Sequence, residues 1–253
     1  MNTRWMPSVT AVIVAGTMLV AAGGLGYVGW RWVSGVTVHQ VDIDGLAYAD
    51  RQQLLDLLDA DTTTYLYDLD ADILADRLQR HPWVHAAQVQ RRPSGTLKVW
   101  LDERRPSLLV LDRSGRRSHY LDRDGFALPL VDAAPFDVPL LRGLREAYHP
   151  VRPVQSVAVR NLLAALPNVT EDEDALLSEF EVTRSGEIVL YTAPTRSGQA
   201  IPVTLGRRDF NQRFQTLRAF WRQAILTQPD KQFTRIDLRF ERQIVTEEAS
   251  TTS

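Results

Sequence analysis

The sequence contains no cysteine among its 253 residues. This absence excludes disulfide bonds, thiol catalysis and cysteine-based zinc sites, but it identifies no compartment, because oxidising and reducing spaces both tolerate it. Charge of one sign is not in excess either, since the formal net charge is -2 at pH 7. The chain therefore has no global electrostatic preference for nucleic acid.

Sequence motifs of the common enzyme classes are also missing. There is no nucleophile elbow, phosphate-binding loop, zinc-binding helix or dinucleotide fingerprint. The five histidines are scattered in different local settings, at His39, His81, His85, His119 and His149. Two carboxylates can still meet in space, so a secreted glycosidase remains the enzyme alternative. We expect a protein without catalytic, cofactor-binding or metal-binding residues and without a small-molecule substrate.

Charged side chains are absent between Arg4 and Arg31. Residues 9–28 are apolar or small throughout, and about 20 such residues form a helix long enough to cross a bilayer. Aromatic residues stand on both sides, as they do at membrane interfaces. We predict a membrane helix at 7–32 behind a short cytoplasmic tail at 1–6. A cleaved signal peptide and a buried core helix remain as alternatives.

Residues 35–105 predict one folded module. A first strand is followed by two helices, for which Asp50 and Asp70 are candidate N-caps. Apolar residues then alternate over 84–89 and again over 97–101, which is the period of half-buried strands. The order β-α-α-β-β places two helices on one face of a three-stranded sheet.

The segment 81–106 has a more specific pattern, HPWVHAAQVQRRPSGTLKVWLDERRP. Pro82 ends the preceding helix because proline cannot donate a backbone hydrogen bond and restricts the residue before it. An arginine- and proline-containing turn separates the two strands. We expect Trp83 to anchor the core and His81 and His85 to lie at the surface on either side of it.

This segment resembles the end of the POTRA module in the FtsQ/DivIB family of bacterial cell-division proteins. The resemblance implies a module that binds polypeptides and not small molecules. The family usually places an aromatic residue before the turn proline, whereas Arg92 precedes a proline here that arrives one residue early. The matching residues are Pro82, Trp83, Val84, Ala87, Val89, Arg91, Pro93, Thr96, Leu97, Val99, Glu103, Arg104 and Pro106.

Residues 106–246 predict a second module, a mixed and mostly antiparallel β domain with two helices. Short strands joined by glycine turns come first, and 137–143 is expected to be a loop. One helix is predicted at 154–166, and a long one with an aromatic stripe follows Asp209, which is its candidate N-cap. The strand Thr234–Phe240 resembles the family's "ID-LRY" signature, with phenylalanine in place of tyrosine. The whole chain is predicted to be α+β.

The resemblance implies a non-enzymatic, single-span type II protein of the cell inner membrane, with its bulk in the periplasm at the division septum. As part of the divisome, it would link and regulate septal peptidoglycan synthesis by binding the FtsB/FtsL coiled-coil pair. The alternative is a POTRA chaperone of an outer-membrane assembly or secretion system. That alternative requires a barrel of many alternating strands, and too few residues follow residue 105.

The strand at 234–245 is predicted to be the last element of its sheet, with an open outer edge that is a template for a strand of another chain. The resemblance implies that an FtsB-like segment binds there, with Arg239 paired to a partner carboxylate and Phe240 over apolar partner residues. Phe240 also shares parity with buried strand positions, so ordinary core is its alternative. A disordered polar tail is predicted at 247–253. The predicted partner-binding residues are Arg239, Phe240, Glu241, Arg242, Gln243, Ile244 and Val245.

Overall fold

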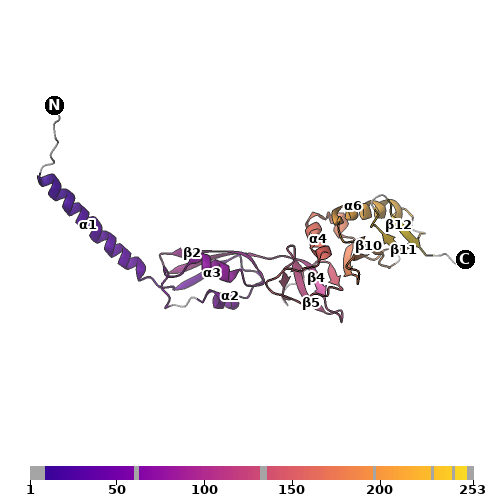
Figure 1. Cartoon of the computed structure of the whole chain (residues 1–253), viewed down its shortest axis with the longest axis horizontal. Coiled ribbons are helices and arrows are strands. Elements are labelled where there is room, and N and C mark those ends of the chain that lie inside the picture. Colours follow the sequence, from indigo (N-terminus) through magenta and orange to yellow (C-terminus); the bar gives the residue numbers. More distant parts are fainter. Residues whose placement is uncertain are drawn as a thin grey trace, which may run out of the picture. The chain divides into compact units, whose positions relative to one another are not determined.

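The computed structural model describes residues 9–59, 63–131, 136–195, 198–228, 231–240 and 243–249. The chain divides into two compact units, Met1–Glu103 and Arg104–Ser253. Figure 1 labels the elements of both units along the chain.

The first unit begins with the helix α1, Val9–Ser34. Its segment Ile13–Trp32 has 20 residues with a mean hydropathy of 1.5, and none of it is buried inside the protein. A buried core helix is therefore excluded, because such a helix would pack its apolar side chains against the rest of the chain. Length and composition fit a helix that crosses a membrane.

The rest of the first unit has the predicted order β-α-α-β-β. Its strands pair in the order β1-β3-β2, with β1 parallel to β3 and β2 antiparallel to it. The unit thus confirms the predicted module. Its elements are β1 (Gln40–Asp44), α2 (Arg51–Leu58), α3 (Ala71–Leu78), β2 (Val84–Arg92) and β3 (Thr96–Glu103).

Both helices of the module begin at the predicted caps. Asp50 Oδ1 accepts a hydrogen bond from the amide of Gln53 at 3.0 Å, and Asp70 Oδ1 accepts one from the amide of Asp72 at 2.9 Å. Each bond satisfies an amide that has no partner within the helix. The apolar sides of the helices and of β3 bury Leu54, Leu58, Leu74, Leu78, Trp83, Leu97 and Val99.

Glu103 at the end of β3 closes the module through its carboxylate. Oε2 accepts from the amides of Tyr48 at 2.8 Å and Ala47 at 3.2 Å, and Oε1 accepts from the amide of Ala49 at 2.9 Å. Hydrogen bonds to a charged acceptor are stronger than those between neutral groups. Glu103 therefore holds the loop before α2 against the last strand.

The prediction for His81 is wrong, because the ring is buried and not at the surface. Its Nε2 lies 3.1 Å from Oε1 of Gln53, and its Nδ1 lies 3.3 Å from the amide nitrogen of Trp83. Burial lowers the pKa of His81 below its ordinary value, although the nearby carboxylates of Glu103 and Asp50 oppose this effect. The ring thus helps to fix the position of Trp83.

The second unit is built on a mixed nine-stranded sheet of described residues, in the order β12-β11-β10-β9-β8-β7-β4-β5-β6. Most neighbours are antiparallel, but β4 with β7, β7 with β8 and β10 with β11 are parallel. The strands are β4 (Pro106–Leu111), β5 (Arg117–Asp122), β6 (Ala127–Leu128), β7 (Leu140–Arg142), β8 (Leu177–Val182), β9 (Ile188–Thr192), β10 (Pro202–Gly206), β11 (Phe233–Asp237) and β12 (Val245–Glu248).

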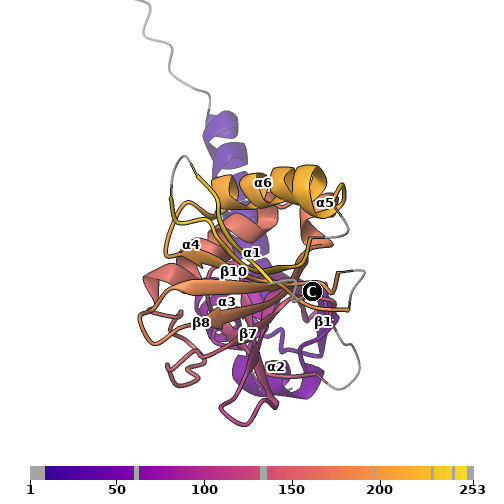
Figure 2. The ribbon, with the colours of Figure 1, turned by 90° about the vertical axis from the view of Figure 1, so that its right-hand side faces the viewer.

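Helices of the second unit cover one face of this sheet. Figure 2 shows α4 (Val157–Ala165) and α6 (Phe210–Phe220) on the same side of the strands. A short 3-10 helix (Leu166–Asn168) and α5 (Glu171–Asp174) follow α4, and a π-helical turn (Trp221–Ile225) extends α6. The core lies between the helices and the sheet and includes Val159, Leu162, Leu163, Phe180, Leu190, Val203, Phe210, Phe214, Leu217 and Ile236.

Three local predictions for this unit differ from the structure. The segment 137–143 is not all loop, because Leu140–Arg142 forms the interior strand β7. The predicted helix at 154–166 begins later, at Val157, where the Ser156 hydroxyl accepts from the amide of Val159 at 3.4 Å. Asp209 precedes α6 in the left-handed conformation, with φ of 61°, and its side chain makes no capping bond.

Candidate partner-binding edge

The predicted edge strand at 234–245 is two strands in the structure, β11 and β12, and among the described residues β12 forms the outer edge of the sheet. β12 pairs antiparallel with β11, with Asp237 opposite Val245 and Ile236 opposite Thr246. The prediction of a disordered tail from Glu247 is likewise wrong at its start, because β12 continues to Glu248. Figure 1 shows β10, β11 and β12 side by side near the C-terminal end.

In the part of the chain that the structure describes, β12 pairs with β11 alone, and two contacts show which of its sides is open. The carbonyl of Glu247 accepts from the hydroxyl of Thr234 at 3.1 Å, and the amide of Ala249 donates to the carbonyl of Gln232 at 2.8 Å. Both groups therefore point toward β11. Backbone groups alternate in direction along a strand, so the amides of Thr246 and Glu248 face away from the sheet. An open edge of this kind can pair with a strand from another chain.

The structure places the predicted site residues between the end of β11 and the start of β12. β11 ends at Asp237, so Arg239 and Phe240 lie in the connection. Phe240 is 48% exposed and is therefore not an ordinary core residue. Gln243 and Ile244 lead into β12, which begins with the exposed Val245. Glu241 and Arg242 lie outside the described residues.

Arg239 already has carboxylate partners inside the chain. Its Nη2 lies 2.6 Å from Oδ2 of Asp237, and its Nη1 lies 3.1 Å from Oε1 of Glu187. Its hydrogen bonds with Asp237 and then Glu187 raise the pKa of Arg239 above its ordinary value. Burial acts to raise the pKa of Asp237, but the bonds from Arg239 outweigh it and the pKa is lowered. A partner carboxylate would have to compete with both acids for Arg239.

A groove of about 320 Å³ lies between the first turns of α6 and the connection from β11 to β12. Sequence reasoning did not identify the residues that α6 contributes to it. The apolar stripe of α6 was predicted, but Arg213 stands immediately before the stripe residue Phe214. No local pattern indicates that such a neighbour faces another segment. The groove is lined by Gln212, Arg213, Thr216, Arg239, Phe240 and Gln243, among others.

A second hollow, of about 230 Å³, lies near the other end of β12. It is mainly apolar, with Trp221, Ile225 and Phe233 in its walls, and it also includes Lys231. The ammonium of Lys231 lies 3.3 Å from the carboxylate of Glu248 on β12. The open edge therefore runs from a polar groove at its start to an apolar hollow at its end.

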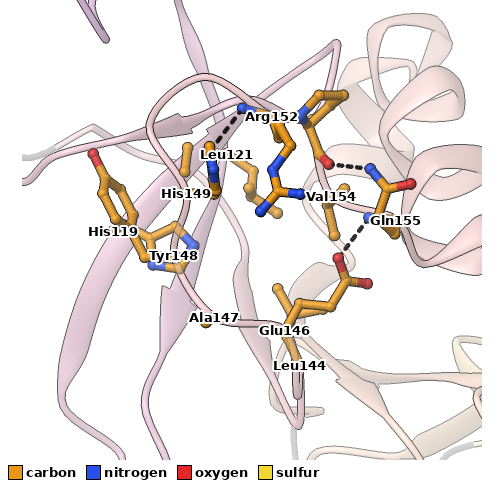
Figure 3. A pocket seen from close by; sticks show the side chains of 13 residues that line it. His119, Leu121, Leu144, Glu146, Ala147, Tyr148, His149, Arg152, Val154 and Gln155 are labelled. Atoms are coloured by element: carbon orange, nitrogen blue, oxygen red, sulfur yellow. Dashed lines mark hydrogen bonds between the residues drawn. The ribbon is translucent and has the colours of Figure 1, made fainter.

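A third cavity, of about 160 Å³, lies under the loop that precedes α4 (Figure 3). Its polar groups hold the loop together, because the Glu146 carboxylate accepts from the amides of Gln155 and Ser156 at 2.5 and 2.6 Å. The His149 ring likewise accepts from the amide of Arg152 at 3.1 Å. The buried His119 ring meets the edge of Tyr148 at 5.3 Å between centroids. These contacts indicate a structural role.

Comparison with known proteins covers both units. Residues 36–104 match the family model described as "POTRA domain, FtsQ-type", and residues 105–247 match "FtsQ/DivIB, C-terminal related". The chain is 43% identical over 237 residues to the cell division protein FtsQ of Rhodothermus marinus, covering 94% of this chain and 86% of that protein. It is 38% identical over 242 residues to FtsQ of Salinibacter ruber, covering 93% of each.

The family match over residues 105–247 rules out the alternative of an outer-membrane assembly chaperone, because the residues after the POTRA module belong to the same family as the module itself. The identities exceed 30% over nearly the full length of both relatives. The chain therefore belongs to the FtsQ/DivIB family of non-enzymatic cell-division proteins.

Proposed function

We propose that the chain recruits and regulates the septal peptidoglycan synthesis complex by binding an FtsB/FtsL-like segment as an added strand on β12. The observation that carries this proposal is the open edge of β12, with the amides of Thr246 and Glu248 turned outward. Main-chain hydrogen bonds would supply affinity, and the exposed side chains of Phe240 and Val245 would supply apolar contact.

The same proposal places α1 across the cell inner membrane as an uncleaved anchor. The cytoplasmic tail would be 1–6, and the POTRA domain (35–105) and C-terminal β domain (106–246) would face the periplasm at the division septum. It is supported by the length and apolarity of α1 and by family membership.

The experiment compares two substitutions at one outward position, Thr246→Pro and Thr246→Val, in the full chain in detergent. Proline removes the outward amide and adds a ring at the edge, whereas valine keeps the amide and suits a strand. The extracytoplasmic segment of the FtsB-like protein from the same genome is titrated against each variant.

We expect Thr246→Pro to weaken binding by about tenfold or more and Thr246→Val to leave it unchanged. Circular dichroism should show the same thermal unfolding for both variants. Equal affinity of a folded Thr246→Pro variant and the unmodified chain would place the partner elsewhere.

A further inference from the structure

Arg213 has a charge that the described part of the chain leaves uncompensated. Its Nη1 is buried and has no hydrogen-bond partner, and Arg213 forms no ion pair with any described residue. Burial lowers the pKa of Arg213, and the charges of Arg208 and Arg239 add to this effect against Asp209 and Asp237. Arginine nevertheless stays protonated in proteins. The side chain as a whole is half-buried, but the buried Nη1 loses its water without gaining a partner, and this is destabilising.

Arg239 lies beside Arg213 in the same groove, and the two differ in what they bind. A Cβ placed on Gly206 would come within 2.7 Å of Nη1 of Arg213 and 3.3 Å of Cγ of Arg239. The two arginines thus converge over a residue that has no side chain. Arg239 is held by Asp237 and Glu187, whereas the guanidinium of Arg213 has no partner among the described residues.

The surroundings of Arg213 favour a carboxylate ligand. The planar guanidinium donates paired hydrogen bonds that match a carboxylate, and the polar residues Gln212 and Gln243 also line the groove. Gln243 and Ile244 run directly into β12. A segment that pairs with β12 therefore passes the mouth of the groove.

We propose that the groove binds an aspartate or glutamate side chain of the partner segment, with Arg213 as the main donor. This inference rests on the proposed strand addition to β12 and adds the chemistry that the partner must carry. It also moves the carboxylate-binding role predicted for Arg239 to a residue on α6.

Glu241 is the competing occupant from the chain itself, because it follows Phe240 directly in the sequence. The first measurement separates the two occupants without any partner. Thermal unfolding of the full chain in detergent is compared for Arg213→Met, Glu241→Gln and the control Arg208→Met, an exposed arginine just before α6.

If the partner supplies the carboxylate, Arg213→Met should unfold at the same or a higher temperature than the Arg208→Met control, because it removes a buried donor that has no partner in the described part of the chain. A lower unfolding temperature for both Arg213→Met and Glu241→Gln would show that Glu241 already neutralises Arg213. That result would overturn the inference.

The second measurement is a double-mutant cycle with the FtsB-like segment. Each acidic residue of the segment is changed in turn to its amide and titrated against the unmodified chain and Arg213→Met. Arg213→Met alone should weaken binding about 30-fold or more. One acid of the segment should couple to Arg213 by about tenfold, and Arg208→Met should couple to none.

The outcomes separate this inference from the proposed function. Absence of coupling at every acid, with Thr246→Pro still weakening binding, would overturn the carboxylate site and leave strand addition in place. Absence of any effect of Thr246→Pro would overturn strand addition. Coupling at one acid together with a sensitive Thr246 would support both.

Discussion

The POTRA module and the β12 end of the second unit differ in how many of their polar groups have partners within the chain. In the POTRA module, Glu103 accepts three backbone amides, and the Lys98 ammonium lies 2.7 Å from Asp42 and 2.6 Å from Asp44. At the β12 end of the second unit, outward amides stand at an open edge and Arg213 has a buried donor without a partner among the described residues.

This difference separates stability from binding. Groups that are satisfied inside a unit contribute to its stability, whereas groups left open gain free energy only when another molecule satisfies them. Substitutions in the POTRA network should therefore change unfolding, and substitutions at the β12 edge should change affinity. Three predictions test whether substitutions in the POTRA module change its unfolding, from the largest expected effect to the smallest.

Trp83→Ala should have the largest effect. Trp83 is buried, and its ring lies 5.3 Å from that of Tyr48 between centroids. Truncating a buried aromatic costs about 3–5 kcal/mol, a large share of the roughly 5–15 kcal/mol that stabilises a domain. Hydrogen exchange followed by mass spectrometry should show that residues 40–103 lose protection while β8 and β9 keep theirs. Equal loss in both units would contradict the separation.

Glu103→Ala should have a smaller effect, about 1.5–3 kcal/mol, because it removes a charged acceptor from several amides at once. The matched control is Asp102→Ala, an exposed acid on the same strand. Chemical unfolding of the full chain measures both. A similar loss of stability in the two variants would show that the effect comes from removing a negative charge from β3. It would then not come from the hydrogen bonds that Glu103 accepts.

His81 should make the stability of the POTRA module depend on pH. Burial lowers the pKa of His81 below its ordinary 6.5, so the unfolded chain takes up a proton at a higher pH than the folded chain. Stability is therefore fully present above about 6.5 and falls as the pH decreases through that value. His81→Gln should flatten the dependence measured by chemical unfolding between pH 7.5 and 5.5.

The buried His119 of the second unit, whose pKa burial also lowers, is the matched control. His119→Gln should flatten the pH dependence of the second unit and leave that of the POTRA module as it was. A module whose pH dependence survives His81→Gln would show that other groups titrate in this range.

Local chemistry made much of the fold predictable. Asp50 and Asp70 begin their helices because a carboxylate next to free amides acts over two or three residues. The alternation in β2 and β3 likewise predicts which side chains are buried, since successive residues of a strand face opposite sides. Such signals do not depend on distant parts of the chain.

Contacts between distant residues were not predictable in this way. The burial of His81 depends on Gln53, 28 positions away. β7 has only three residues and is a strand because β4 and β8 lie on both sides of it. The outer edge of the sheet is β12, because the four residues Val245–Glu248, three of them polar, pair with β11.

The sequence by itself determined the N-terminal apolar helix, the POTRA module with its core, and the α+β class, because each depends on periodicity, composition or local capping. The tertiary structure decided which strand is the edge, which arginine is satisfied and which is not. Arg239 and Arg213 are the same residue type, and each is followed directly by a phenylalanine in the sequence. They differ because Asp237 and Glu187 lie beside one guanidinium and not beside the other, and only the packing of α6 against the end of the sheet brings about that difference.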